Sequence, residues 1–175
     1  KGVFIMTTTT INIALTGHRP DKLDGYSLNT EFYKKMRHQL MSIIVQNLEQ
    51  YDTVICHTGM ALGADTIWAE AIANMKHKFG DRVQFIAHIP CKNQTVKWRK
   101  ASVDHYNKLM EYADEDILYS EAYTKTCMQL RNIGMVDRAD TLIAIWDGSK
   151  GGTENCVRAA IERHVHIEQI KPDTF

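Results

Sequence analysis

The sequence predicts one α/β domain in which a mostly parallel, doubly wound sheet is covered by helices on both faces. Three observations lead to this fold class. The chain has 175 residues, the size of a single ordinary domain. Apolar residues make up 44% of it and charged residues 24%, which is the balance of a globular protein. Short apolar runs alternate with longer segments of helical periodicity, and this alternation is typical of parallel sheets.

The strands are predicted by short apolar runs rich in β-branched residues. The run at residues 141–146 is the most continuous, and Pro90 ends the third run because proline cannot donate a hydrogen bond within a sheet. We expect the first and fifth strands to be central, since strands that are buried on both faces are apolar throughout. The predicted strands cover residues 11–16, 53–57, 83–88, 117–119, 141–146 and 167–170.

The helices are predicted by apolar residues spaced three and four apart. The first helix has this spacing at Phe32, Met36 and Leu40, and Asn29 or Thr30 is placed to cap it. The predicted helices cover residues 29–50, 62–78, 96–112, 124–138 and 153–164. Ahead of the first strand, residues 1–10 are expected to be a flexible leader or a remnant of an expression vector, and residues 11–175 a single domain.

The composition limits the cellular compartment and the classes of binding partner that we expect. The 21 basic and 21 acidic residues balance, which makes nucleic acid an unlikely partner because sequence-independent binders need a basic surface. The four cysteines show no CxxC pairing and predict free thiols in the cytoplasm. No apolar run approaches the roughly 18 residues of a membrane span. The histidines and cysteines lack metal-site spacing, so we expect no metal.

The candidate site lies in the loops that follow the strands. Parallel sheets bind ligands beyond the carboxyl ends of their strands, where the strand order reverses. After the first strand come Thr16, Gly17, His18 and Arg19. Gly17 lets the backbone approach a ligand closely, while His18 and Arg19 can donate hydrogen bonds to phosphate. The alternative is a tight turn with two solvated cations.

A second candidate loop leads into the helix at residues 62–78. Gly59 and Gly63 stand four residues apart, and Ala64 and Asp65 follow at the start of the helix. The free amides and the positive dipole end at such an entrance suit an anion. Asp65 either complements the dipole itself or holds a ribose hydroxyl. The spacing matches neither a Walker phosphate loop nor the GxGxxG fingerprint.

The loop after the fifth strand has the same character. Asp147 is followed by Gly151, Gly152 and Thr153, with Glu154 in the first helical turn. The glycines and the helix start describe a second anion cradle, although Thr153 also suits an ordinary N-cap. Two such entrances at one edge of the sheet favour a shared ligand.

Two side chains on the helix before the fifth strand complete the candidate set. Arg131 and its neighbour Asn132 lie where an arginine can reach back over the cleft. The residues alone favour an ordinary exposed helical arginine instead. The three tryptophans are expected to pack in the core or in loops rather than to stack on bases.

Together these loops resemble the SLOG superfamily, and more narrowly its YpsA-like branch. The resemblance spans about residues 11–163. It rests on Thr16-Gly17-His18-Arg19-Pro20, on Gly59 through Asp65, and on Trp146-Asp147-Gly148 with Gly151-Gly152-Thr153. It implies a Rossmann-like fold and binding of nucleotides or nucleotide-derived ligands. Members include LOG-type phosphoribohydrolases, the DNA-processing protein DprA and sensor domains of antiviral systems.

The similarity to the LOG enzymes is partial. Their segment reads approximately M-x-x-R-K-x-x-M, and Met128, Arg131 and Met135 match it, with Asn132 where lysine is expected. Their catalytic glutamate falls one or two positions after Glu154, where this chain has no acid. The resemblance therefore implies a ligand contact for Arg131, whereas the hydrolase chemistry does not carry over cleanly.

Two hypotheses of function follow. The favoured one is a binder, or sensor, of a nucleotide-type ligand, with no other cofactor. The alternative is an N-glycosidic hydrolase of a nucleoside monophosphate, which needs a carboxylate near the developing positive charge on the ribose. Asp65, Asp147 and Glu154 are the candidate acids. A DNA-associated role like that of DprA is disfavoured by the charge balance. We also expect a homodimer or a higher homo-oligomer.

Overall fold

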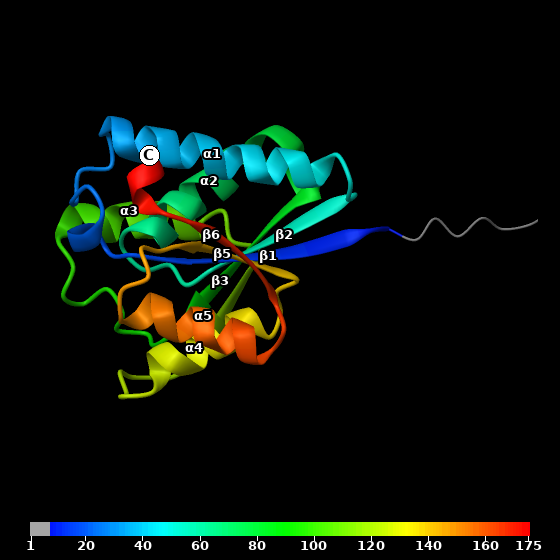
Figure 1. Ribbon diagram of the computed structural model, residues 1–175. Coiled ribbons are helices and arrows are strands. Elements are labelled where there is room, and N and C mark those ends of the chain that lie inside the picture. Colours follow the sequence, from blue (N-terminus) through cyan, green and yellow to red (C-terminus); the bar gives the residue numbers. More distant parts are fainter. Residues whose placement is uncertain (1–7) are drawn as a thin grey trace, which may run out of the picture.

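The computed structural model describes residues 8–175, in which six parallel strands form one sheet in the order β4-β3-β2-β1-β5-β6 (Figure 1). The strands are β1 (Thr10–Gly17), β2 (Thr53–Thr58), β3 (Val83–Ile89), β4 (Glu115–Leu118), β5 (Thr141–Ile145) and β6 (His166–Ile170). The helices are α1 (Glu31–Leu48), α2 (Ala64–Phe79), α3 (Lys100–Met110), α4 (Cys127–Val136) and α5 (Gly152–Glu162). Short 3-10 turns occupy Pro20–Lys22, Gly80–Arg82 and Pro172–Thr174. The predicted parallel α/β fold is confirmed.

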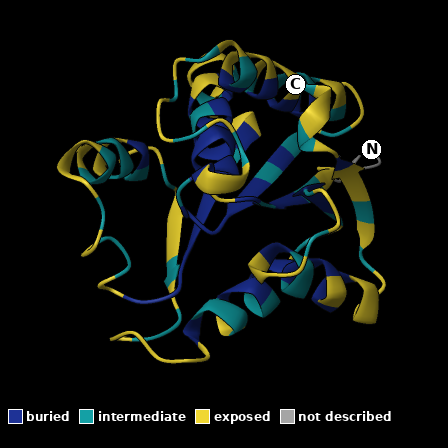
Figure 2. Cartoon of the chain, turned by 60° about the vertical axis from the view of Figure 1, so that its left-hand side comes forward, coloured by how far each residue is buried: buried dark blue, intermediate teal, exposed yellow. Residues whose placement is uncertain are grey.

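Helices cover both faces of the sheet because the chain winds outward from β1 in two directions. It first proceeds through β2 and β3 to β4, which places α1, α2 and α3 on one face (Figure 1). It then crosses back to β5 and β6, which places α4 and α5 on the other face. Trp68 and Phe85 belong to the core on the first face, while Met135 and Leu142 belong to the smaller core on the second. Figure 2 shows the buried segments of the sheet and of the helices in dark blue.

The two strands expected to be central are both interior. β1 pairs with β2 on one side and with β5 on the other, and β5 also pairs with β6. Ala14 in β1 and Leu142 in β5 are register partners and are fully buried. This placement agrees with the mostly apolar composition of both strands.

The first strand begins one residue earlier than the sequence predicts. Residues 1–7 of the expected leader lie outside the described residues, but Thr9 and Thr10 belong to the sheet region. The carbonyl of Thr9 accepts hydrogen bonds from the amides of Asp52 and Thr53 at 3.0 and 3.2 Å, and β1 begins at Thr10. Backbone pairing extends the strand past the end of its apolar run.

One helix begins later than its apolar spacing suggests. α3 starts at Lys100 rather than at residue 96. The preceding segment forms short turns, with the amides of Val96 and Trp98 donating to the carbonyls three residues earlier. Val96 is 72% exposed, so it belongs to no buried helical face.

A chain of hydrogen bonds between side chains crosses the sheet, and its two histidines, His57 and His88, are buried. The Nε2 of His57 lies 3.1 Å from Oδ1 of Asn12, and its Nδ1 lies 2.9 Å from Nε2 of His88. The Nδ1 of His88 in turn lies 2.8 Å from the hydroxyl of Tyr119. With the Asn12 oxygen as acceptor, each ring donates from Nε2 and accepts at Nδ1, so both histidines are neutral. Burial lowers the pKa of His57 to about 4 and that of His88 to about 3.

Candidate functional site

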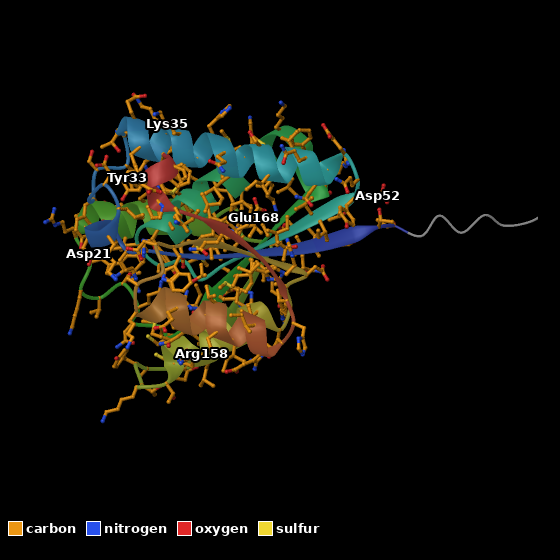
Figure 3. All side chains as sticks on the ribbon, viewed as in Figure 1. Asp21, Tyr33, Lys35, Asp52, Arg158 and Glu168 are labelled. Carbon is orange, nitrogen blue, oxygen red and sulfur yellow. The ribbon has the colours of Figure 1, made fainter. Side chains whose placement is uncertain are left out.

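The candidate site lies at the switch point of the sheet, between β1 and β5. These strands are parallel neighbours whose following segments turn to opposite faces, so their loops part at the carboxyl edge. A cavity of about 420 Å³ occupies this position. Asp21, which lies on its rim, is labelled at this end of the molecule in Figure 3.

The loop after β1 forms one side of the cavity, where Thr16, Gly17, His18 and Arg19 all line it. Gly17 is required for packing, because a Cβ there would overlap the Cβ of Ala64. The exposed Arg19 side chain lies in the concave mouth, where the surrounding protein lowers its pKa. This loop therefore brings the cation of Arg19 to the cavity, while Gly17 allows α2 to pack closely against β1.

A buried ion pair forms the base of the cavity. Nη1 of Arg131, on α4, lies 3.4 Å from Oδ2 of Asp65 on α2, and both side chains are more than nine-tenths buried. Burial raises the pKa of Asp65, against the opposing effect of Arg131 and then of Arg19. Gly59 lies under this pair, because a Cβ there would overlap the guanidinium. Nε of Arg131 has no hydrogen-bond partner among the described residues.

The entrance of α5 is the open end of the cavity. Gly151, Gly152 and Thr153 line it, and Nδ2 of Asn132 reaches the carbonyl of Gly152 at 3.4 Å. Glu154 accepts the amide of Gly151 at 3.4 Å. Within residues 8–175, no acceptor meets the amides of the next three residues, at the positive end of the helix dipole. This entrance can therefore accommodate an anion.

The entrance of α2, by contrast, is filled by the protein itself. The amide of Ala64 donates to the carbonyl of His18 at 3.1 Å, and the amide of Ala61 donates to Asp65 Oδ2 at 3.2 Å. Gly63 has a φ of +97° and packs against the same His18 carbonyl. Of the two cradles that the sequence suggests, the α5 entrance is the one whose first three helical amides all lack an acceptor among the described residues.

Most of the predicted ligand residues line the cavity, and the others lie outside its lining. Ten line the cavity: Thr16, Gly17, His18, Arg19, Asp65, Arg131, Asn132, Gly151, Gly152 and Thr153. Gly59, Gly63, Ala64 and Asp147 do not. The lining also includes Ala61, Ser149 and Lys150, which lie within the predicted loops, and four residues that were not among the predicted contacts: Asp21, Lys22, Met128 and Met135. A basic residue three positions after Arg19 was the available signal for Lys22, which donates to Ser149 Oγ across the mouth at 2.7 Å.

Two of the three candidate catalytic acids are engaged outside the lining. Oδ1 of Asp147 accepts the Ser149 amide at 2.8 Å and lies 2.7 Å from His18 Nε2, and these contacts, the Ser149 bonds first, hold its pKa well below its usual range. Glu154 caps the α5 entrance. Asp65 lines the cavity but is paired with Arg131.

Arg131 is buried, so the expectation of an exposed helical arginine, drawn from the residues alone, is wrong. Its side chain reaches inward from α4 because Gly59 leaves space for the guanidinium and Asp65 compensates its charge. A glycine in one loop and an acid in a neighbouring helix are not visible from the periodicity of α4.

The described helices include none that is long and apolar enough to cross a membrane. Within residues 8–175 no cluster of three or more potential metal ligands occurs. All four cysteines are free and buried.

Solved structures with a similar fold include DNA processing protein A. The protein from Streptococcus pneumoniae matches with a TM-score of 0.59 and 19% identity, over 91% of this chain and 50% of that one. The protein from Helicobacter pylori, whose structure is described in terms of single-stranded DNA binding, matches with a TM-score of 0.61 and 16% identity, over 92% and 65%. This chain thus spans about half to two thirds of those proteins.

Relatives in sequence come from Bacillus. The uncharacterized SPbeta prophage-derived protein YoqJ of Bacillus subtilis is 27% identical over 155 residues, which cover 79% of this chain and 89% of that protein. A UPF0398 protein of Bacillus cereus is 22% identical over 161 residues, covering 89% and 85%. The family model described as the YspA SLOG family matches residues 13–174. The chain therefore belongs to the YspA SLOG family, as its loop motifs suggest.

Proposed function

We propose that this protein binds a nucleotide-type ligand in the cavity between β1 and β5, with a phosphate at the entrance of α5. The observation that carries the proposal is the combination of unused amides at this entrance with Arg131, whose buried Nε has no partner among the described residues. Helix N-termini bind phosphate through such amides and through the helix dipole. A buried guanidinium that lacks a full set of acceptors favours an anionic ligand.

The charge of the lining supports the same ligand class. Arg19, Lys22, Arg131 and Lys150 line the cavity, against two carboxylates, whereas the whole chain is neutral. Positive charge is thus concentrated where the amides are unused. A cavity of about 420 Å³ lies in the size range of pockets for small ligands.

The candidate carboxylates are already engaged in ion pairs or hydrogen bonds, which favours binding over N-glycosidic hydrolysis. Hydrolysis needs a carboxylate free to face the ribose and to activate water. Asp65 is tied to Arg131, while Asp147 and Glu154 hold loop amides. The remaining carboxylate in the lining, Asp21, lies on an exposed 3-10 turn. We therefore propose a binder or sensor, in a reducing compartment such as the cytoplasm; a homo-oligomer stays a prediction.

Single-stranded DNA is a ligand that the test has to include. The fold of this chain resembles a protein whose structure is described in terms of single-stranded DNA binding. That similarity makes the expected exclusion of nucleic acid doubtful, even though the neutral charge balance gives no evidence of a long basic track. The phosphate site proposed here suits a terminal or backbone phosphate equally.

The test is calorimetric titration with inorganic phosphate, nucleoside mono- and diphosphates, ADP-ribose and a short single-stranded oligonucleotide. Lys150→Ala is expected to weaken binding by about 1 kcal/mol or more, because it removes a charge-assisted contact. Arg158→Ala removes an exposed charge from α5 outside the cavity and is the matched control (Figure 3). Gly152→Val should abolish phosphate binding, because the added side chain would occupy the space in front of the helix amides. The protein should stay folded, because that space is open.

Two results would contradict parts of the proposal. Wild-type affinity in folded Gly152→Val protein would remove the phosphate from the α5 entrance. Release of free base, detected by chromatography after incubation with the same nucleotides, would establish the hydrolase instead.

A further inference from the structure

A second cavity, of about 300 Å³, lies against the first on the side of α2 and α3. The two cavities share a wall made of the loops after β1 and β2. Arg19 lines the larger cavity and Pro20 the smaller one; Ala61 lines the larger, while Met60 and Leu62 line the smaller. The amide-to-carbonyl hydrogen bond that closes the α2 entrance joins these loops. The smaller cavity is therefore a separate site.

Aromatic rings distinguish the smaller cavity from the larger one. Tyr26, Trp98 and Tyr106 line it, whereas the lining of the larger cavity contains no phenylalanine, tyrosine or tryptophan. Trp98 meets Tyr106 edge to face, with centroids 5.6 Å apart and planes at 84°. Tyr26 is 55% exposed, and the guanidinium of Arg99 lies 5.3 Å from its ring centroid. The cavity thus offers aromatic surface that the protein leaves uncovered.

Polar groups of α2 and α3 line the same cavity. Oε1 of Glu70 lies 2.7 Å from Nε2 of His105, and Oε2 accepts from Nε of Arg37 at 2.6 Å. The Glu70 charge is thereby compensated, so the cavity has no spare anion to attract a cationic ligand. Nδ1 of His105 and the hydroxyl of Ser102, one turn earlier on α3, have no hydrogen-bond partner among the described residues. They are available to the edge of a ligand.

We propose that this second cavity binds a planar heteroaromatic ring of the nucleobase class. Trp98 lines the cavity and is only partly buried, which makes it the ring for stacking, and Tyr26 lies at the exposed rim. His105 and Ser102 offer hydrogen bonds to heteroatoms at the ring edge. A purely aliphatic ligand would leave these polar groups without partners, whereas a nucleobase satisfies both features. The volume admits a nucleoside. Trp98 therefore serves as a stacking platform rather than as loop packing alone.

The ring can come from a free nucleoside or from a base of a single strand, and the experiment separates these sources. Tryptophan fluorescence is recorded while adenosine, guanosine, cytidine and uridine, all without phosphate, are added to the full chain. A second series uses short single-stranded oligonucleotides. Quenching by either series is expected, and quenching by the oligonucleotides alone would assign the ring to a strand.

Variants identify which tryptophan reports the binding. Trp98→Phe should remove the quenching but keep the calorimetric affinity, while Trp98→Ala should weaken binding by roughly 5- to 150-fold, which corresponds to about 1–3 kcal/mol of base stacking. Trp146→Phe, near the larger cavity, should leave both signals unchanged. Circular dichroism checks that each variant is folded.

The proposed phosphate site at the α5 entrance can be refuted while the proposed nucleobase site in the second cavity still holds. Gly152→Val should leave nucleoside binding intact even where it abolishes phosphate binding. Loss of nucleoside binding in folded Gly152→Val protein would place the ring in the larger cavity and overturn the proposal. No binding of nucleosides or oligonucleotides to the wild-type chain would overturn it as well.

Discussion

The buried pair His57 and His88 should make the protein sensitive to mild acid. Both folded-state pKa values, about 4 and about 3, lie below the value of about 6.5 for histidine in an unfolded chain. The unfolded chain therefore takes up protons first, and stability is lost as the pH falls from about 6.5 toward 4. Linkage gives about 2 kcal/mol per histidine between pH 7 and pH 5, or about 4 kcal/mol for the pair. That loss is a large share of the free energy of unfolding of a typical domain, which is roughly 5–15 kcal/mol.

Urea unfolding followed by circular dichroism at pH 7, 6 and 5 measures this loss. His88→Gln removes one of the two titrating rings, so the loss between pH 7 and pH 5 should fall to about 2 kcal/mol. His38→Gln removes an exposed histidine on α1 and is the matched control, which should keep the full loss. If His88→Gln and the wild-type protein lose the same stability over this range, the buried chain of neutral rings is not the origin of the acid sensitivity.

Three glycine substitutions test the packing around the larger cavity. Gly59→Ala should lower the free energy of unfolding by about 1–3 kcal/mol, because its Cβ would overlap the Arg131 guanidinium. Gly152→Ala, whose Cβ meets open space, should leave stability nearly unchanged, and urea unfolding compares the two. Gly17→Ala should likewise lower Tm, because its Cβ would overlap Ala64; an unchanged Tm would show that β1 and α2 can move apart at low cost.

The sequence by itself determined the fold class and the position of the candidate site. Apolar β-branched runs and helical periodicity are local signals, so they predict strands and helices without knowledge of the remaining chain. Parallel connections then require the loops after the strands to share one edge, which predicts that Gly17 and Gly152 lie close together, and both line one cavity. Helix ends were less well predicted, as at α3, because turns can imitate helical spacing.

The tertiary structure alone decided which helix entrance is open, which charges are buried and where the aromatic rings gather. The carbonyl of His18 fills the α2 entrance by accepting the amide of Ala64, which lies far along the sequence. Arg131 is buried because Gly59 and Asp65, from other elements, make space for it and compensate its charge. The aromatic cavity likewise forms between segments that are distant in the chain. Such contacts depend on the relative placement of whole elements, which local periodicity does not encode.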